Sequence, residues 1–145
     1  MTAYADTSFL VSLYTPDSNS RLAAARMRNL RDAVLLTSFG ELELTNAIEL
    51  RVFRRELTVS EVKAALAAFE SDVGDGVFTV VPTPATMYER ARQLARAHTA
   101  KMGTRTLDIL HVAAALVLKA DSFYTFDRRQ RDLAKSENLS APVRI

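Results

Sequence analysis

Four carboxylates stand at positions that an ordinary surface role explains poorly. Asp6 and Asp127 each end a short β-prone run. Asp108 lies in the first turn of an almost wholly apolar helical stretch, and Glu43 has apolar neighbours on both sides. Because burying an unpaired carboxylate is costly, such side chains need a proton, a cation or a hydrogen-bonding partner. These four residues are therefore the first candidates for chemistry.

A shared site for the four carboxylates would favour a hard cation. At about 5 Å and an effective dielectric of about 20, each ionised pair repels by on the order of 3 kcal/mol. Such a cluster therefore persists only where protons or a cation neutralise it. Ligation by oxygen alone favours Mg²⁺ or Mn²⁺ over zinc. An ion of this kind suits phosphate chemistry, because it polarises a phosphoryl oxygen and helps to deprotonate an attacking water.

Simpler interpretations exist for some of these residues. A helix N-terminus favours anions, so Asp108 is also explained as an N-terminal carboxylate paired with an arginine such as Arg105. Glu43 is also compatible with a plain solvent-facing carboxylate. His111, about one turn after Asp108, is expected to be a structural histidine rather than a catalytic base, and His98 is assigned no function.

The elements that must position these carboxylates alternate between strands and helices. The expected strands are 2–5, 34–37, 77–81, 122–126 and 143–145. The expected helices are 8–14, 21–31, 38–55, 58–74, 84–100, 107–119 and 128–136. This alternation predicts an α/β fold, in which a central parallel sheet of about five strands carries helices on both faces. Ligands bind beyond the carboxyl ends of such strands, where Asp6 and Asp127 stand.

Capping patterns predict several of the helix starts. Ser38 with Glu41, and Thr58 with Glu61, have the spacing of a capping box. Thr83-Pro84 places a capping hydroxyl before a proline at the first helical position.

Length and composition exclude several classes of protein. The chain has 145 residues, which fits one domain over residues 1–145. Hydrophobic residues make up 48% and charged residues 25%, which is ordinary globular usage. The absence of cysteine excludes a disulfide scaffold, a thiolate nucleophile and cysteine-ligated zinc or iron–sulfur clusters. With only two histidines, one chain cannot build a three-histidine site.

Charge and hydropathy predict a cytoplasmic protein without a membrane segment. The net charge of +2 allows an anionic partner without demanding one. The N-terminus lacks the basic region and apolar stretch of a signal peptide. The longest apolar run, Ile109 to Leu118, is interrupted by His111 and is too short to span a bilayer.

Four segments together carry a family resemblance. They are Tyr4–Val11, Glu43–Ala47, Leu107–Ala115 and Tyr124–Asp127. No single segment is specific, but they occur in family order, with family-like separations, across nearly the whole chain. The sequence resembles the PIN-domain ribonucleases, and most closely the VapC-type toxins of toxin–antitoxin systems.

The resemblance implies a single PIN-like domain that hydrolyses RNA endonucleolytically with a metal-activated water. Asp6, Glu43, Asp108 and Asp127 would form the catalytic pocket. Asp6 and Asp108 would be direct ligands of one or two Mg²⁺ or Mn²⁺ ions, while Glu43 and Asp127 would bind the metal partly through water. All four acidic positions are intact, so the resemblance implies an active site.

Three smaller polar residues would support the carboxylates under the same resemblance. Ser8 (or its neighbour Thr7) and Thr125 would hold carboxylates or waters, and Asn46 would orient Glu43. Each has an alternative interpretation: Ser8 as a helix N-cap, Thr125 as an ordinary strand residue and Asn46 as a helix-surface amide.

The basic residues beside Asp127 are compatible with more than one kind of partner. Arg128 and Arg129 follow Asp127 directly, so they could grip RNA phosphates beside the pocket, or form a solvated helix face or a partner's docking site. The resemblance implies a tRNA or rRNA substrate, a cognate antitoxin protein and a homodimer. Apolar faces in 21–31 and 58–73, which include Leu66 and Phe69, fit either such surfaces or core packing.

Competing functions remain open from the sequence. The chain could be a housekeeping PIN-domain RNA-processing nuclease, or a non-catalytic PIN-like module that binds RNA or protein. A haloacid-dehalogenase-like phosphatase also places an aspartate after its first strand, as Asp6 is placed. That mechanism generally needs a second aspartate two positions later, where this chain has Ser8.

Overall fold

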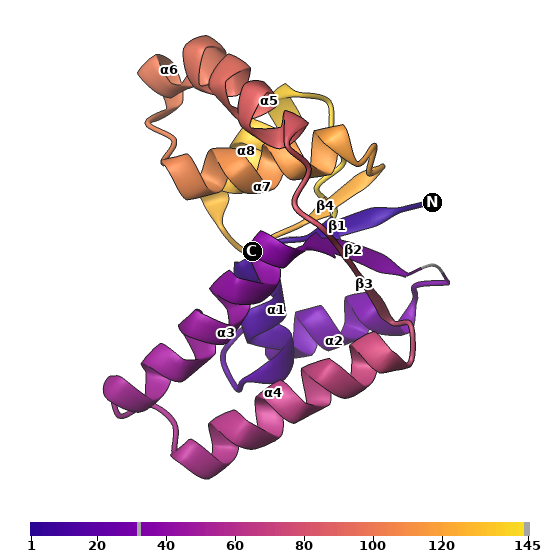
Figure 1. Ribbon diagram of the computed structural model, residues 1–145, viewed down its shortest axis with the longest axis vertical. Coiled ribbons are helices and arrows are strands. Elements are labelled where there is room, and N and C mark those ends of the chain that lie inside the picture. The colour runs from indigo at the N-terminus through magenta and orange to yellow at the C-terminus, as the bar shows by residue number, and fades with distance from the viewer. Residues whose placement is uncertain (32, 144–145) are drawn as a thin grey trace.

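The computed structural model describes residues 1–31 and 33–143 and shows a parallel sheet between two layers of helices (Figure 1). The strands are β1 (Ala3–Ala5), β2 (Val34–Thr37), β3 (Phe78–Val81) and β4 (Ser122–Tyr124). The helices are α1 (Thr7–Tyr14), α2 (Ser20–Arg28), α3 (Ser38–Phe53), α4 (Val59–Gly74), α5 (Thr86–Leu94), the π-helical turn η1 (Ala95–Thr99), α6 (Ala100–Met102), α7 (Thr106–Val117) and α8 (Arg128–Ser136). The α/β prediction is confirmed.

The sheet has the order β3-β2-β1-β4, and its paired strands are parallel. The first strand therefore lies inside the sheet, with Tyr4 opposite Leu35 on one side and Phe123 on the other. Side chains alternate between the faces of a strand. Accordingly Ala3 and Ala5 lie in one hydrophobic core, and Tyr4 lies in the other.

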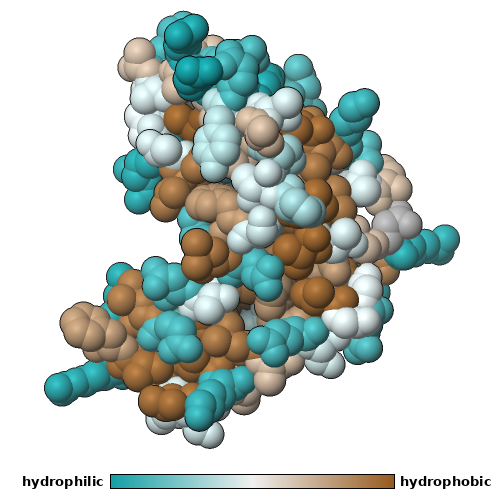
Figure 2. Space-filling view, in the orientation of Figure 1, coloured by the Kyte–Doolittle hydropathy of each residue, from teal (hydrophilic) through white to brown (hydrophobic). Residues whose placement is uncertain are grey.

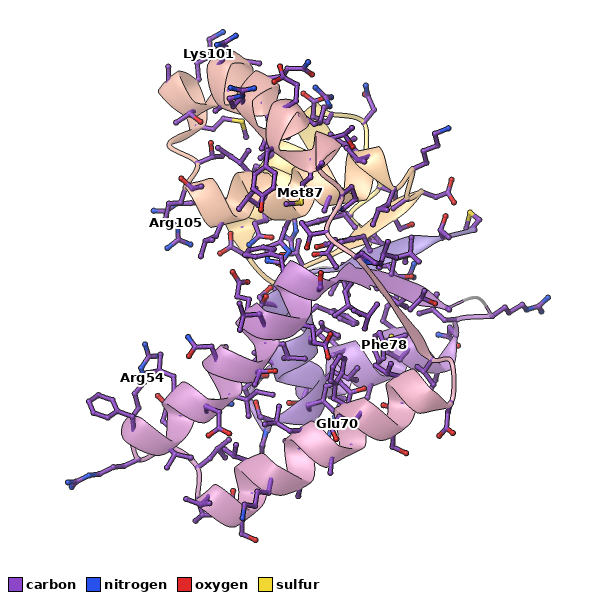
Figure 3. All side chains as sticks on the ribbon, viewed as in Figure 1. Arg54, Glu70, Phe78, Met87, Lys101 and Arg105 are labelled. Atoms are coloured by element: carbon purple, nitrogen blue, oxygen red, sulfur yellow. The ribbon has the colours of Figure 1, made fainter. Side chains whose placement is uncertain are left out.

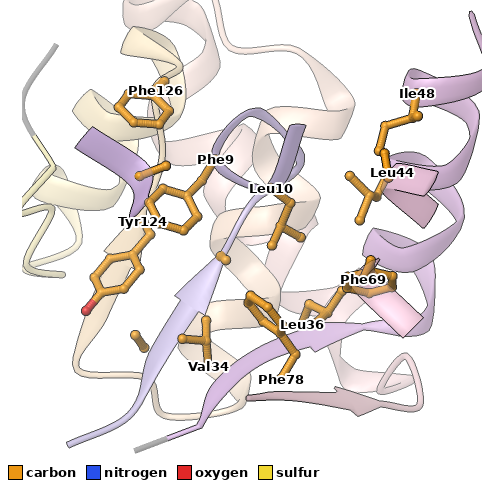
Figure 4. Close-up of a cluster of buried hydrophobic side chains, with 14 of the residues drawn as sticks. Phe9, Leu10, Val34, Leu36, Leu44, Ile48, Phe69, Phe78, Tyr124 and Phe126 are labelled. Carbon is orange, nitrogen blue, oxygen red and sulfur yellow. The ribbon is translucent and has the colours of Figure 1, made fainter. Parts of the chain in front are cut away.

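One core packs helices α1 to α4 against the sheet. Phe9 and Leu10 of α1 belong to it, together with Leu36 of β2, Leu44 of α3 and Phe69 of α4 (Figure 4). Phe69 is buried, and Leu66 packs against the same cluster. Core packing therefore accounts for this apolar face of α4.

The other core covers the opposite face of the sheet. Helices α5, α7 and α8 contribute to it, with Val112, Phe123 and Leu133 fully buried. The consecutive alanines 113–115 of α7 are also fully buried. Small side chains there let α7 lie close to its neighbours, and this fixes the position of the helix that carries Asp108.

The first and last residues of several predicted strands and helices differ from those in the structure. The fifth expected strand, 143–145, falls mostly outside the described residues, while Ser140 forms an isolated parallel bridge with Ser122. Thr58 is the N-cap of α4 as predicted, because its Oγ1 accepts from the Glu61 N–H at 3.1 Å. The Glu61 carboxylate accepts from the Thr58 hydroxyl at 2.9 Å, rather than from the backbone N–H that a capping box would use. The N-cap of α3 is Thr37 rather than Ser38, since Thr37 Oγ1 accepts from the Gly40 N–H at 3.1 Å.

Thr83 does not cap the helix that follows it. Its hydroxyl accepts from the Phe39 N–H at 3.1 Å and lies 3.0 Å from Ser38 Oγ, so it serves the start of α3 instead. The predicted helix 84–100 begins only at Thr86 and passes through the π-helical turn at Ala95–Thr99. The Thr83 hydroxyl thus bonds to Phe39, 44 residues earlier, instead of capping the helix that follows it. No helix in the described parts of the chain is long and apolar enough to cross a bilayer.

Candidate active site

Asp6 is the most deeply enclosed of the four carboxylates. It ends β1 and is the N-cap of α1, where its side chain accepts from the Phe9 N–H at 2.9 Å. The residue is completely buried. Burial raises the pKa of this carboxyl above its ordinary value, while the charge of His111 and the hydrogen bonds from Thr125, Phe9 and Ser8 act in the opposite direction.

Ser8 and Thr125 hold Asp6 from two different elements. Ser8 Oγ donates to the Asp6 carboxylate at 2.7 Å, and Thr125 Oγ1 donates to it at 2.5 Å. Ser8 Oγ also accepts from the Phe126 N–H at 2.9 Å, and Thr125 Oγ1 accepts from the Asp127 N–H at 2.9 Å. These hydroxyls tie the carboxyl end of β4 to that of β1, and the N-cap role that Ser8 was also predicted to fill belongs to Asp6.

Glu43 reaches the same region from α3. Its Oε1 accepts from Thr7 Oγ1 and lies 2.7 Å from His111 Nε2. Its Oε2 is buried and has no hydrogen-bond partner in the described structure. Burial alone would raise the pKa of Glu43, but the hydrogen bond and charge of His111, with the Thr7 hydrogen bond, lower the pKa below its ordinary value. Asn46 is exposed, and Thr7 and His111 rather than Asn46 contact Glu43.

His111 is buried, as a structural histidine would be, but it also contacts the candidate site. Its Nδ1 lies 3.0 Å from the Tyr4 hydroxyl, and its Nε2 faces Glu43. Burial raises the pKa of Tyr4 far above its ordinary value, so the phenol keeps its proton. If that proton is donated to Nδ1, the other ring nitrogen carries the hydrogen that Glu43 accepts. The sequence signal was the spacing of His111 one helical turn after Asp108.

Asp108 and Asp127 lie at the starts of α7 and α8, where Asp108 is buried and Asp127 is partly exposed. Asp108, in the first turn of α7, accepts from the Arg105 backbone N–H at 3.0 Å and from Gln130 Nε2 at 3.3 Å. Asp127 caps α8 by accepting from the Gln130 N–H at 3.0 Å. Sequence reasoning did not single out Gln130, although its position three residues after Asp127 is the position that an N-cap addresses.

Arg105 joins these two carboxylates. Its Nε lies 3.2 Å from Asp108 Oδ2, and its Nη2 lies 3.6 Å from Asp127 Oδ2. The predicted pairing of Asp108 with Arg105 is therefore present, and the same guanidinium also reaches Asp127. The hydrogen bond and charge of Asp108 raise the pKa of Arg105 further.

The carboxylates lie within electrostatic reach of one another. The charge of Asp108 acts to raise the pKa of Glu43, and the charges of Asp6 and Glu43 both act to raise that of Tyr4. Within residues 1–31 and 33–143, no three His, Asp or Glu side chains are close enough to form a ligand shell as they stand.

The surface near this region is hollowed. Figure 2 shows a deep notch between the part of the molecule built from α5 to α7 and the part built from α3 and α4. Arg105 lies at the edge of the α7 side facing this notch (Figure 3). Arg128 and Arg129 are both exposed, and Arg128 comes within 4.0 Å of Asp132 one turn along α8. They begin the helix that Asp127 caps, as the sequence predicted.

Comparison with models of protein families identifies the fold. The model of the PIN domain matches residues 3–136, which is most of the chain. The chain belongs to the PIN-domain family. The resemblance seen in the four sequence segments is therefore confirmed, and the PIN domain contains all four candidate carboxylates. No curated protein sequence matches the chain significantly.

Solved structures similar to this PIN domain include a toxin and two further bacterial proteins. VapC20 of Mycobacterium tuberculosis, a toxin that cleaves the sarcin–ricin loop, has a TM-score of 0.68 at 20% identity, with 90% of this chain and 93% of that chain covered. FitAcB from Neisseria gonorrhoeae gives 0.65 at 17%, with 96% and 94% covered. VapBC2 from Rickettsia felis, bound to a DNA fragment from its promoter, gives 0.63 at 16%, with 91% and 92% covered. At these identities the likeness is one of fold.

Proposed function

We propose that this PIN-domain protein is a divalent-metal-dependent endoribonuclease and the toxin of a toxin–antitoxin pair. The observation that carries the proposal is Asp6: a fully buried carboxylate, inside a PIN fold, that accepts hydrogen bonds from hydroxyl and amide groups of the described residues. A carboxylate so placed favours a cation or a proton nearby. The other three predicted carboxylates surround the same edge of the sheet.

The residues present fit a divalent cation. The candidate donors are all oxygens, and Glu43 Oε2 is buried without a partner among the described residues. The Arg105 guanidinium beside Asp108 and Asp127 supports this assignment, because a cation already lies next to these two carboxylates. Mg²⁺ usually keeps several waters and takes only one or two protein carboxylates. We assign Asp6 and Asp108 as its direct ligands, with Glu43 and Asp127 acting through water. Bound there, Mg²⁺ or Mn²⁺ would polarise the scissile phosphate and acidify a water.

The side chains of this chain supply the remaining requirements. Ser8 and Thr125 fix the orientation of the Asp6 carboxylate, so it needs little reorganisation during the reaction. His111 and Thr7 occupy one oxygen of Glu43 and leave the other free to accept a hydrogen bond from water. Arg128 and Arg129, exposed beside Asp127, would bind RNA phosphates on either side of the cut.

Partners are proposed from the similar structures. VapC20 cleaves the sarcin–ricin loop, which supports a structured RNA of the rRNA or tRNA class as substrate. VapBC2 supports a cognate antitoxin protein as partner. A homodimer and a cytoplasmic location complete the proposal by analogy with VapC-type toxins.

The test is cleavage of a mixed cellular RNA pool by the purified protein, with Mg²⁺, with Mn²⁺ and with EDTA. We expect discrete cleavage that requires the metal and falls by at least about a hundredfold in Asp6→Asn, which removes a charge from the site. The matched control is Asp75→Asn, because Asp75 is exposed at the end of α4. Folded protein that binds no Mn²⁺ and cleaves no RNA would favour a non-catalytic binding module.

Expression in cells separates a toxin from a housekeeping nuclease. We expect the wild-type chain to arrest growth when expressed alone, and Asp6→Asn to be tolerated. Co-expression with the product of a neighbouring antitoxin gene should restore growth. Metal-dependent cleavage in vitro without growth arrest would support the housekeeping role instead.

A further inference from the structure

Arg105 holds an unusual place beside the carboxylates. Its side chain is 63% exposed, whereas that of Asp108 beneath it is only 2% exposed. One guanidinium thus lies over a buried carboxylate and reaches a second one, at 3.2 Å from Asp108 and 3.6 Å from Asp127. An exposed cation thus lies beside two residues of a site assigned to a divalent cation.

We propose that Arg105 competes with the divalent ion for Asp108 and Asp127, and that the ion frees its guanidinium to bind a phosphate of the RNA. The inference rests on the proposed nuclease function and adds a residue that couples metal loading to substrate binding. Arg105 is thus assigned as a substrate-binding residue of the loaded site.

The exchange is feasible because Asp108 does not depend on the Arg105 side chain for its position. Asp108 Oδ2 also accepts from the backbone N–H of residue 105 at 3.0 Å, and Asp108 Oδ1 accepts from Gln130 Nε2 at 3.3 Å. Both oxygens keep a donor when the guanidinium turns away. Ion pairs with one exposed partner contribute little and are screened by salt, so a divalent ion can displace this one.

The released side chain suits a phosphate. The planar guanidinium presents its donors as a fork that matches two phosphate oxygens. A divalent ion near Asp108 repels the guanidinium, while an RNA strand attracts it. Arg105 faces the notch, and Arg128 and Arg129 lie just beyond Asp127, so the three cations would follow one strand past the carboxylates.

A purely structural role predicts a different outcome. If Arg105 only stabilised the start of α7, removing its side chain would loosen Asp108 and weaken metal binding. The helix-capping contact comes from the backbone N–H, which any residue except proline keeps. Competition instead predicts tighter metal binding once the side chain is removed.

The experiment measures Mn²⁺ affinity by calorimetry, separately from cleavage. We expect Arg105→Ala to lower the Mn²⁺ dissociation constant about two- to tenfold, the range for loss of exposed pairs. Arg128→Ala removes a neighbouring charge that does not contact the site carboxylates, and should change the constant less than about twofold. Arg105→Lys, which keeps the charge without the fork, should fall between Arg105→Ala and the wild type.

The second arm uses RNA cleavage at saturating Mn²⁺. We expect Arg105→Ala to raise KM about tenfold, as loss of a charged hydrogen bond does, while kcat changes little. Unchanged or weaker Mn²⁺ binding by Arg105→Ala, in a wild type that binds Mn²⁺ and cleaves RNA, overturns the inference alone. Tighter Mn²⁺ binding with an unchanged KM overturns the phosphate role. No Mn²⁺ binding by the wild type overturns the proposed function and this inference together.

Discussion

The two halves of the candidate site hold their carboxylates with different kinds of partner. Asp6 and Glu43 are held by side chains that the cores bury or half-bury, namely Ser8, Thr125, Thr7 and His111. Asp108 and Asp127 instead share an exposed guanidinium from Arg105. The first half is fixed by folding, while the second half retains a partner that can leave. Changes in the first half should therefore affect stability, and changes in the second should affect mainly ligand binding.

The strongest test of the fixed half is His111. Substitution by Leu leaves the Tyr4 hydroxyl and a Glu43 oxygen without their shared buried partner, so we expect the free energy of unfolding to fall by about 2–3 kcal/mol. Denaturant titration measures this loss. His111→Gln, whose amide can still donate toward Glu43, should recover part of the cleavage rate that His111→Leu loses. Equal cleavage by both variants would remove the positioning role of His111.

Asp6→Asn should stabilise the protein while it inactivates the site. Burial raises the pKa of Asp6 above its ordinary value of 3.8, so the folded state disfavours the charged form. We expect the melting temperature in EDTA at neutral pH to rise by about 3–4 °C, as roughly 1 kcal/mol would give. The control is Asp75→Asn, which should melt like the wild type.

The same substitution has a defined pH dependence. A carboxyl whose folded pKa is raised lowers stability as the pH increases from its unfolded pKa through its folded pKa. The advantage of Asp6→Asn should thus be absent well below pH 3.8, grow above it and be complete once the folded pKa is passed. Unfolding in EDTA across this range measures the difference. A constant difference at all pH values would contradict the proposed cause.

Tyr4→Phe is expected to lower the stability less than His111→Leu does. It removes the hydroxyl that contacts His111 Nδ1 but keeps the buried ring, which stacks against Phe123 at 5.8 Å between ring centroids. We expect a loss of about 1 kcal/mol in the free energy of unfolding. Denaturant titration beside Phe123→Leu separates the hydrogen bond from the ring packing, because that second variant should lose more stability.

Arg105→Ala should show the smallest change in stability. Its side chain is exposed and its ion pairs are screened, so we expect a melting temperature within about 1 °C of the wild type. A large fall in the melting temperature would mean that both halves are fixed by the fold. The contrast between His111→Leu and Arg105→Ala is thus the most direct measure of the difference between the halves.

The sequence singled out the candidate carboxylates through local signals, and their assignment to one site remains a prediction. A carboxylate after a strand, or in the first turn of an apolar helix, is visible within a few residues, as it was for Asp6 and Asp108. The pairing of Asp108 with Arg105 spans only three residues and was also anticipated. The fold class followed from alternating strands and helices in the same way.

The contacts that the sequence missed join residues far apart in the chain. His111 meets Glu43 across 68 residues, and Thr83 serves the start of α3 across 44 residues. Neither contact leaves a periodic pattern in the chain. The π-helical turn at Ala95–Thr99 also lacks a proline or glycine to mark it. Local reasoning therefore located the acids but assigned Asn46, rather than His111 and Thr7, to orient Glu43.

The position of β1 inside the sheet also sets when the site can assemble. The Thr125 hydroxyl that holds Asp6 is separated from it by 119 residues. At a synthesis rate of about 5–20 residues per second, the ribosome needs roughly 6–24 s to make the intervening chain. Asp6 thus lacks Thr125 and Asp127 until synthesis has passed residue 127. A nascent chain, or one that ends before residue 125, therefore lacks part of the candidate site.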